Sequence, residues 1–108
     1  MIDFSSAVRG NRFTYTVSGH SLAAPRGADV VCAALSTLTY LVYFSAKQLE
    51  KDGLLSEFSH TAAPGYAKID FTVRDAGIPR ARLVFDSVGA TVAGISANYP
   101  KNVKVKRY

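Results

Sequence analysis

The chain begins with two short segments in which apolar and polar side chains alternate. Residues 13–18 read F-T-Y-T-V-S, which is the period-two pattern of a strand with one buried face. Residues 2–8 show a similar alternation, and Gly10-Asn11 between the two segments suits a tight turn. The N-terminal part of the chain is therefore predicted to be a β-hairpin.

A longer apolar repeat follows a loop that is expected from Gly19 to Gly27. Between about Ala28 and Lys51, apolar residues recur at intervals of three, four and seven, as in an amphipathic helix. Asp29 is suited to cap the N-terminus of this helix, and Gly53 is suited to end it. The predicted buried stripe consists of Val31, Leu35, Leu38, Val42 and Leu49.

The second half of the chain repeats the order of strands followed by a helix. Short strand patterns cover Leu54–Thr61 and Tyr66–Arg74, separated by an A-A-P-G turn. A second helix is predicted from Pro79 to about Ala97, and Val103–Arg107 alternates as a last strand. The predicted order is β-β-α-β-β-α-β, an α+β fold with a mixed sheet covered by two helices.

Length and composition favour one globular domain over residues 1–108. Hydrophobic residues make up 48% and charged residues 19% of the chain, close to the average for globular proteins. One Cys and two His cannot supply a structural zinc site, so we expect no metal and no cofactor. The single Cys, which cannot form a disulfide within the chain, and the lack of a leader-like N-terminus favour the cytoplasm. The apolar segment Val30–Phe44 is expected to be too short to span a membrane.

Positive charge allows a nucleic-acid partner without requiring one. The net charge is +5, and basic residues gather at Lys101–Arg107 and around Arg74, Arg80 and Arg82. These groups could contact phosphates of RNA or of a ribosome. Lysines on an edge strand also prevent strand addition and keep a protein soluble, without binding anything.

The candidate chemistry lies at His20 and Cys32. His20 follows the second predicted strand at a flexible loop, and Cys32 falls in the predicted first helical turn. Free backbone N–H groups and the helix dipole at such a turn favour a thiolate. A nearby His could then accept the thiol proton and later protonate a leaving amine.

A free Cys in an apolar helix is, however, often only a packing residue. Cys32, Ser36, Thr39 and Tyr43 follow one another at helical spacing and form a semi-polar stripe distinct from the buried one. This arrangement favours a partly exposed Cys32, while leaving both interpretations open.

Other polar residues near this segment also have two interpretations. Asp29 could cap the helix or orient His20 as a third catalytic group. Ser36 could donate to substrate or simply bond within the helix. His60 is interpreted as a solvated loop residue. The aromatic side chains Tyr40, Tyr43 and Phe44 are interpreted as core, with Tyr43 as first candidate if an aromatic substrate pocket exists.

The residues around Cys32 resemble a known family. Gly19-His20, followed by G-A-D-V-V-C-A-A-L-S over residues 27–36, is similar to the ribosomal-processing cysteine proteases called Prp. The N-Y-P-K segment at residues 98–101 and the basic last strand resemble the end of that family. The expected order of elements agrees over essentially the whole chain.

This resemblance implies a homodimeric bacterial enzyme that removes a short N-terminal extension from a large-subunit ribosomal protein, cutting after an aromatic-rich motif. Cys32 would be the nucleophile and His20 the general base. The loop Ser21–Ala28 would close over the peptide, with Gly19 and Gly27 as hinges. Backbone N–H groups of the first helical turn could form an oxyanion hole.

Two other functions remain open at this point. The chain could be a non-catalytic module that associates with RNA or the ribosome. It could also use the same dyad on another substrate, such as a phage structural protein with a similar cleavage motif.

Overall fold

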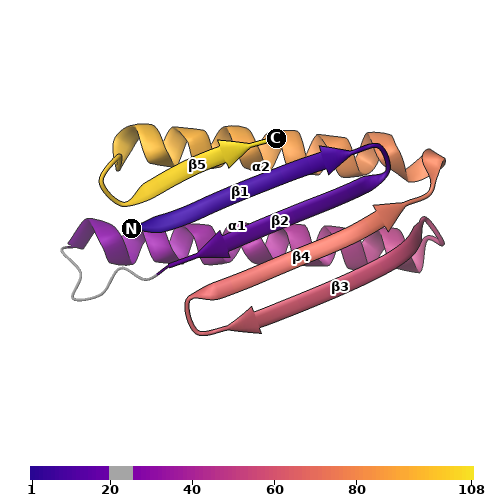
Figure 1. The fold of residues 1–108 in the computed structure, drawn as a ribbon, viewed down its shortest axis with the longest axis horizontal. Helices are drawn as coiled ribbons and strands as arrows, with labels where there is room; N and C mark the ends of the chain where they lie inside the picture. The colour runs from indigo at the N-terminus through magenta and orange to yellow at the C-terminus, as the bar shows by residue number, and fades with distance from the viewer. Residues whose placement is uncertain (20–25) are drawn as a thin grey trace.

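The computed structural model (Figure 1) describes the backbone of residues 1–19 and 26–108 and the side chains of residues 1–19 and 30–108. Five strands form one sheet in the order β3-β4-β2-β1-β5. Helices α1 and α2 lie side by side across one face of it. The elements are β1 (Ile2–Arg9), β2 (Arg12–Ser18), α1 (Arg26–Lys51), β3 (Leu55–Ala63), β4 (Tyr66–Val73), η1 (Asp75–Gly77), α2 (Ile78–Asn98) and β5 (Val103–Arg107).

The sheet is mixed, which confirms the predicted fold class. β1 and β2 form an antiparallel hairpin closed by Gly10-Asn11, where Gly10 has the positive φ of 60° that such a turn requires. β2 also pairs antiparallel with β4, and β4 with β3. β5 returns from α2 and lies parallel to β1, from Ile2 opposite Val103 to Ser6 opposite Arg107.

Alternation along the strands places apolar side chains toward the helices. The fully buried positions of the sheet include Phe4, Phe13, Tyr15 and Ile69. The predicted stripe of α1 is largely confirmed, with Leu38 partly buried and the other four residues buried. Further buried residues of the helices, among them Ala46, Ala81 and Phe85, were not predicted from the sequence.

The start of α1 differs from the prediction. The helix begins at Arg26 rather than Ala28, so Asp29 lies inside it and is not its N-cap. Cys32 is then the seventh residue of the helix and belongs to its second turn, where a backbone N–H has an acceptor four residues earlier. Apolar periodicity marks the positions that pack against the sheet, and for that reason it missed this first turn.

The hairpin of β3 and β4 is also longer than predicted. β3 continues to Ala63, and the turn consists of Pro64-Gly65 alone, with Gly65 at a φ of 73°. Ala62 and Ala63 have weak strand preferences, and pairing with Ala67 and Tyr66 brings them into the sheet. Pro79 lies in the first turn of α2, as expected.

The length of α1 corrects one expectation about membranes. Its segment Val30–Lys51 has 22 residues and a mean hydropathy of 1.4, which by length and composition would be enough to cross a bilayer. The expectation considered only Val30–Phe44, whereas the apolar positions Ala46 and Leu49 extend the stretch. In the fold, these two residues are buried in the core.

A candidate active-site groove beside Cys32

A groove of about 500 Å³ lies between α1 and the hairpin of β3 and β4. One wall is the polar stripe of α1. The other side consists mainly of small residues near the hairpin turn, including Ala62, Ala63, Gly65 and Ala67. Because these side chains are short, they leave space opposite α1. The helix contributes Cys32, Leu35, Ser36, Thr39, Tyr40, Tyr43 and Phe44.

Cys32 lies at the N-terminal end of this wall. Its side chain is partly buried, packs against the core and lines the groove. The predicted stripe is confirmed, because Ser36, Thr39 and Tyr43 line the same groove. Ser36 is exposed one turn after Cys32, so its hydroxyl is available to a bound molecule.

Thr39 connects the wall of the groove to the sheet. Its hydroxyl donates to the Leu35 carbonyl oxygen at 2.8 Å and therefore accepts the hydrogen bond from the Tyr15 hydroxyl, also at 2.8 Å. Tyr15 is almost fully buried, and this burial raises its pKa to about 12. The bonded pair holds this part of α1 against β2.

Gly19 brings the end of β2 to the groove. It has a φ of 113°, and a Cβ at this position would overlap the backbone carbonyl oxygen of Met1, so only glycine fits. Its N–H donates to the Gly65 carbonyl oxygen at 2.8 Å. Gly19 and Cys32 thus line one groove. His20, the residue after Gly19, lies outside the described residues.

Other predicted site residues fall at the start of α1. Gly27 and Asp29 belong to the backbone of its first turn. The predicted closing loop is Ser21–Ala28. Residues 21–25 of it lie outside the described residues, and residues 26–28 are helical. Because the backbone N–H of Cys32 lies in the second turn, it bonds within the helix and does not belong to the free amides that were expected to bind an oxyanion.

His60 was wrongly interpreted as a loop residue. It is exposed, but it lies within β3 opposite Ile69, and its ring centroid is 4.8 Å from that of Tyr43. His60 also lines the groove. Its alternation with Phe58 and Ala62 along the strand was the sequence signal that could have placed it on the face covered by the helices.

The aromatic residues of α1 are only partly core. Tyr40 and Phe44 are 65% and 63% exposed, so their interpretation as core residues was wrong. Tyr43, the first candidate for an aromatic substrate pocket, is partly buried and lines the groove. The groove thus combines a thiol with exposed aromatic rings.

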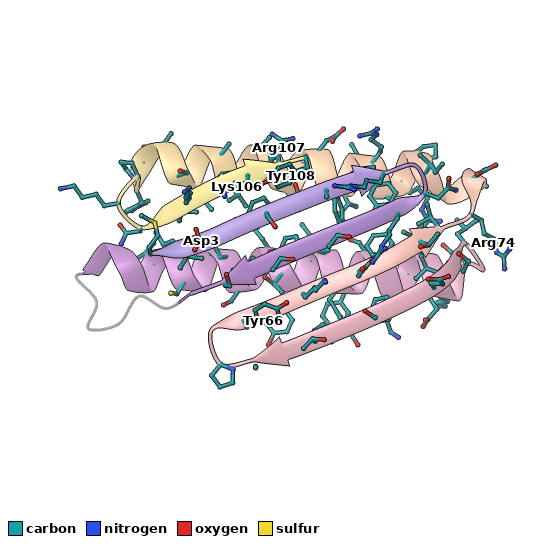
Figure 2. All side chains as sticks on the ribbon, viewed as in Figure 1. Asp3, Tyr66, Arg74, Lys106, Arg107 and Tyr108 are labelled. Carbon is teal, nitrogen blue, oxygen red and sulfur yellow. The ribbon has the colours of Figure 1, made fainter. Side chains whose placement is uncertain are left out.

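The two groups of basic residues lie apart. Arg74 is near the end of β4, whereas Lys106 and Arg107 are on β5 (Figure 2). Arg80 forms an ion pair with Asp52 at 2.8 Å, which lowers the pKa of that carboxyl group. Among the described residues, no group of three His, Cys, Asp or Glu side chains could hold a metal ion.

A thiol that lines an open groove of about 500 Å³ suits an enzyme that attacks its substrate through sulfur. The family model described as cysteine protease Prp matches residues 1–104, so the chain belongs to this family of cysteine proteases. Family membership decides against the non-catalytic alternative. No curated protein matches the sequence.

Solved structures share the fold over the full chain. The ribosomal processing protease Prp of S. aureus, in complex with a substrate peptide, has 15% identity and a TM-score of 0.70, with 100% of both chains covered. The same enzyme with a covalently linked product peptide has 19% identity and a TM-score of 0.67, again with 100% of both chains covered. SMU.848 from Streptococcus mutans has 20% identity and a TM-score of 0.72, covering 99% of this chain and 93% of that one.

Proposed function

We propose that this protein is a cysteine endopeptidase that removes a short N-terminal extension from a bacterial large-subunit ribosomal protein. The observation that carries the proposal is the position of Cys32 in a groove long enough for a peptide, in a chain that the cysteine protease Prp model covers. The similar S. aureus enzyme is described as a ribosomal processing protease and binds a substrate peptide.

Cys32 acts as the nucleophile and His20 as the general base in this proposal. His20 takes the thiol proton, the Cys32 Sγ bonds to the peptide carbonyl carbon, and the C–N bond breaks as His20 protonates the leaving amine. Water then attacks the thioester and gives its proton to His20, and the departing thiolate recovers a proton. The covalently linked product peptide in the S. aureus enzyme supports a step of this kind.

Three further residues would assist this reaction. Ser36 is exposed on the groove one turn after Cys32, where its hydroxyl would donate to the bound peptide. Asp29 would orient His20 and stabilise its protonated form. Gly19 would act as one hinge of the loop that closes over the peptide, with Gly27 as the other.

The proposal is tested by cleavage of a peptide that spans the N-terminal extension and the mature start of the host's ribosomal protein. We expect one cut after the aromatic motif, located by mass spectrometry. Cys32→Ala and His20→Ala should each lower kcat/KM at least about a thousandfold. Thr37→Ala is the matched control, because Thr37 is exposed on α1 outside the groove.

Two results would overturn the assignment. One is a cut that persists in the Cys32→Ala protein. The other is no cut by the unaltered protein, together with alkylation of Cys32 at neutral pH that is no faster than for a free cysteine.

We further propose that the enzyme is a cytoplasmic homodimer. Val30 and Leu41 support self-association, because they are 58% and 50% exposed on α1 and lie outside the groove. Leu41→Glu should halve the mass measured by light scattering, whereas Thr61→Glu, which is exposed on the opposite face of the sheet, should leave it unchanged. A mass of one chain for the unaltered protein would contradict the dimer, and recovery in the membrane fraction would contradict the location.

A further inference from the structure

The groove has a second end, far from Cys32. Tyr43 follows Cys32 by eleven residues along α1, which at about 1.5 Å per residue separates them by roughly 16 Å along the helix. On the opposite side, β3 runs from His60 to its end at Ala63, roughly 10 Å at about 3.4 Å per residue, and the turn Pro64-Gly65 lies beyond it. Cys32 and Gly65 therefore lie near one end of the groove, and Tyr43 and His60 lie near the other.

The distal end is formed by rings that already contact one another. The Tyr43 ring centroid lies 4.8 Å from that of His60 and 5.2 Å from that of Phe44. Beyond them, Phe58 lies 6.0 Å from Tyr43, and the Lys47 Nζ covers the Phe58 ring at 4.8 Å. Tyr43 is partly buried, whereas His60 and Phe44 are exposed. These contacts fix the rings and leave one side open to the groove.

His60 is too far along the groove to share a proton with Cys32. Its ring pairs with Tyr43, which is about three helical turns from the thiol. A partly buried phenol beside an imidazole instead provides apolar faces with polar edges. Such a surface packs well against an aromatic or long aliphatic side chain.

We propose that Tyr43 and His60 form a distal subsite that selects a large apolar side chain of the substrate, about four or five residues from the scissile bond. An extended peptide advances about 3.4 Å per residue, so this many residues reach from Cys32 to Tyr43. The subsite rests on the proposed peptidase function and adds a specificity determinant to it. Its residues bind the peptide and take no part in the chemical step.

The experiment uses the cleavable ribosomal peptide with single replacements by Ala and by Phe. The replaced positions are the third to the sixth residue on each side of the cut. For the unaltered protein, a peptide with Ala at the fourth or fifth residue on one side of the cut should have a kcat/KM about tenfold lower than the peptide with Phe there. The change should come mainly from a higher KM.

His60→Ala and Tyr43→Leu should remove this preference to within about twofold. The preference for the aromatic residue beside the cut should be retained in both variants. Thr61→Ala is the matched control. Thr61 follows His60 in β3, so its side chain, like that of its strand partner Lys68, lies on the face of the sheet opposite the groove. The distal preference should be unchanged in the control.

Failure of the subsite and failure of the proposed function give different results. Cleavage with a distal preference that is unchanged in both variants overturns the subsite alone, as does cleavage with no distal preference at all. The absence of any cleavage overturns the proposed function.

In that case, the affinity of the Cys32→Ala protein for the same peptides, labelled with fluorescein, tests whether the subsite exists. A preference for Phe over Ala that is lost on adding His60→Ala supports it. No such preference, or one that survives His60→Ala, overturns it.

Discussion

Two groups of aromatic rings lie on the same side of the sheet and differ in what covers them. The core rings are Phe13, Phe71 and Phe85, whose centroids are 5.1 to 5.7 Å apart. The groove rings are Tyr43, Phe44 and His60. The core rings are at most 4% exposed. Among the groove rings, Phe44 is 63% exposed and His60 is also exposed.

The difference arises from how far the two helices extend across the sheet. α2 lies over β5 and β1, and its Phe85 reaches the rings of Phe13 on β2 and Phe71 on β4. α1 packs beside α2, so the helix-facing side of edge strand β3 lies at the margin of the helical layer (Figure 1). Small residues near the turn after β3 then leave the groove open. The same chemical type of side chain therefore stabilises the fold in one place and lines the groove in the other.

The largest expected effect separates the two groups by stability. Phe13→Ala removes a fully buried ring and should lower the free energy of unfolding by about 3 to 5 kcal/mol. Phe44→Ala should change it by less than about 0.5 kcal/mol, because most of that ring is already in water. Urea denaturation measures both values. Similar losses for the two variants would contradict the comparison.

The buried Tyr15 links the core to the groove and should make stability depend on alkaline pH. Burial raises its pKa from 10.0 to about 12, so the unfolded chain loses the proton first as pH rises. The stabilisation is complete below pH 10 and should fall by about 2 to 3 kcal/mol as pH rises through 12. Unfolding followed between pH 9 and 12 should show this decline. In Tyr15→Phe, it should be absent.

Filling the groove should affect activity more than stability. Ala62 is exposed and lines the groove, so Ala62→Leu should lower kcat/KM for the ribosomal peptide about tenfold, an effect of about 1.4 kcal/mol. Its melting temperature should stay within a few degrees of the unaltered value. Thr61→Leu, on the opposite face, controls for the added side chain. Equal activity in the two variants would show that the peptide binds elsewhere.

The smallest expected effect lies on the open face of the sheet, away from both groups of rings. Arg12 contacts Asp70 at 2.6 Å, and this hydrogen bond lowers the pKa of the Asp70 carboxyl group. The resulting stabilisation is present above the ordinary carboxyl pKa and is lost as pH falls below it. Because Arg12 is well exposed, Asp70→Asn should cost less than Phe13→Ala at neutral pH. High salt should reduce the cost of Asp70→Asn further, because it screens the exposed ion pair.

The strands and helices were predictable because each has one buried face. Alternation over residues 13–18 and the three-and-four spacing of Val31, Leu35 and Val42 report this burial directly. The ends were less predictable. The first turn of α1 and the alanines at the end of β3 have no apolar periodicity, so the helix start, the role of Asp29 as a cap and the length of the hairpin turn were wrong.

The sequence by itself determined the order of the elements, the buried stripe of α1 and the separate polar stripe that carries Cys32. These features follow from the spacing of residues within one element. Only the tertiary structure decided that β5 lies beside β1, that Gly19 meets Gly65 and that His60 faces Tyr43. Such contacts join residues distant in sequence, and they depend on strand register and on how far each helix covers the sheet, which local periodicity does not encode.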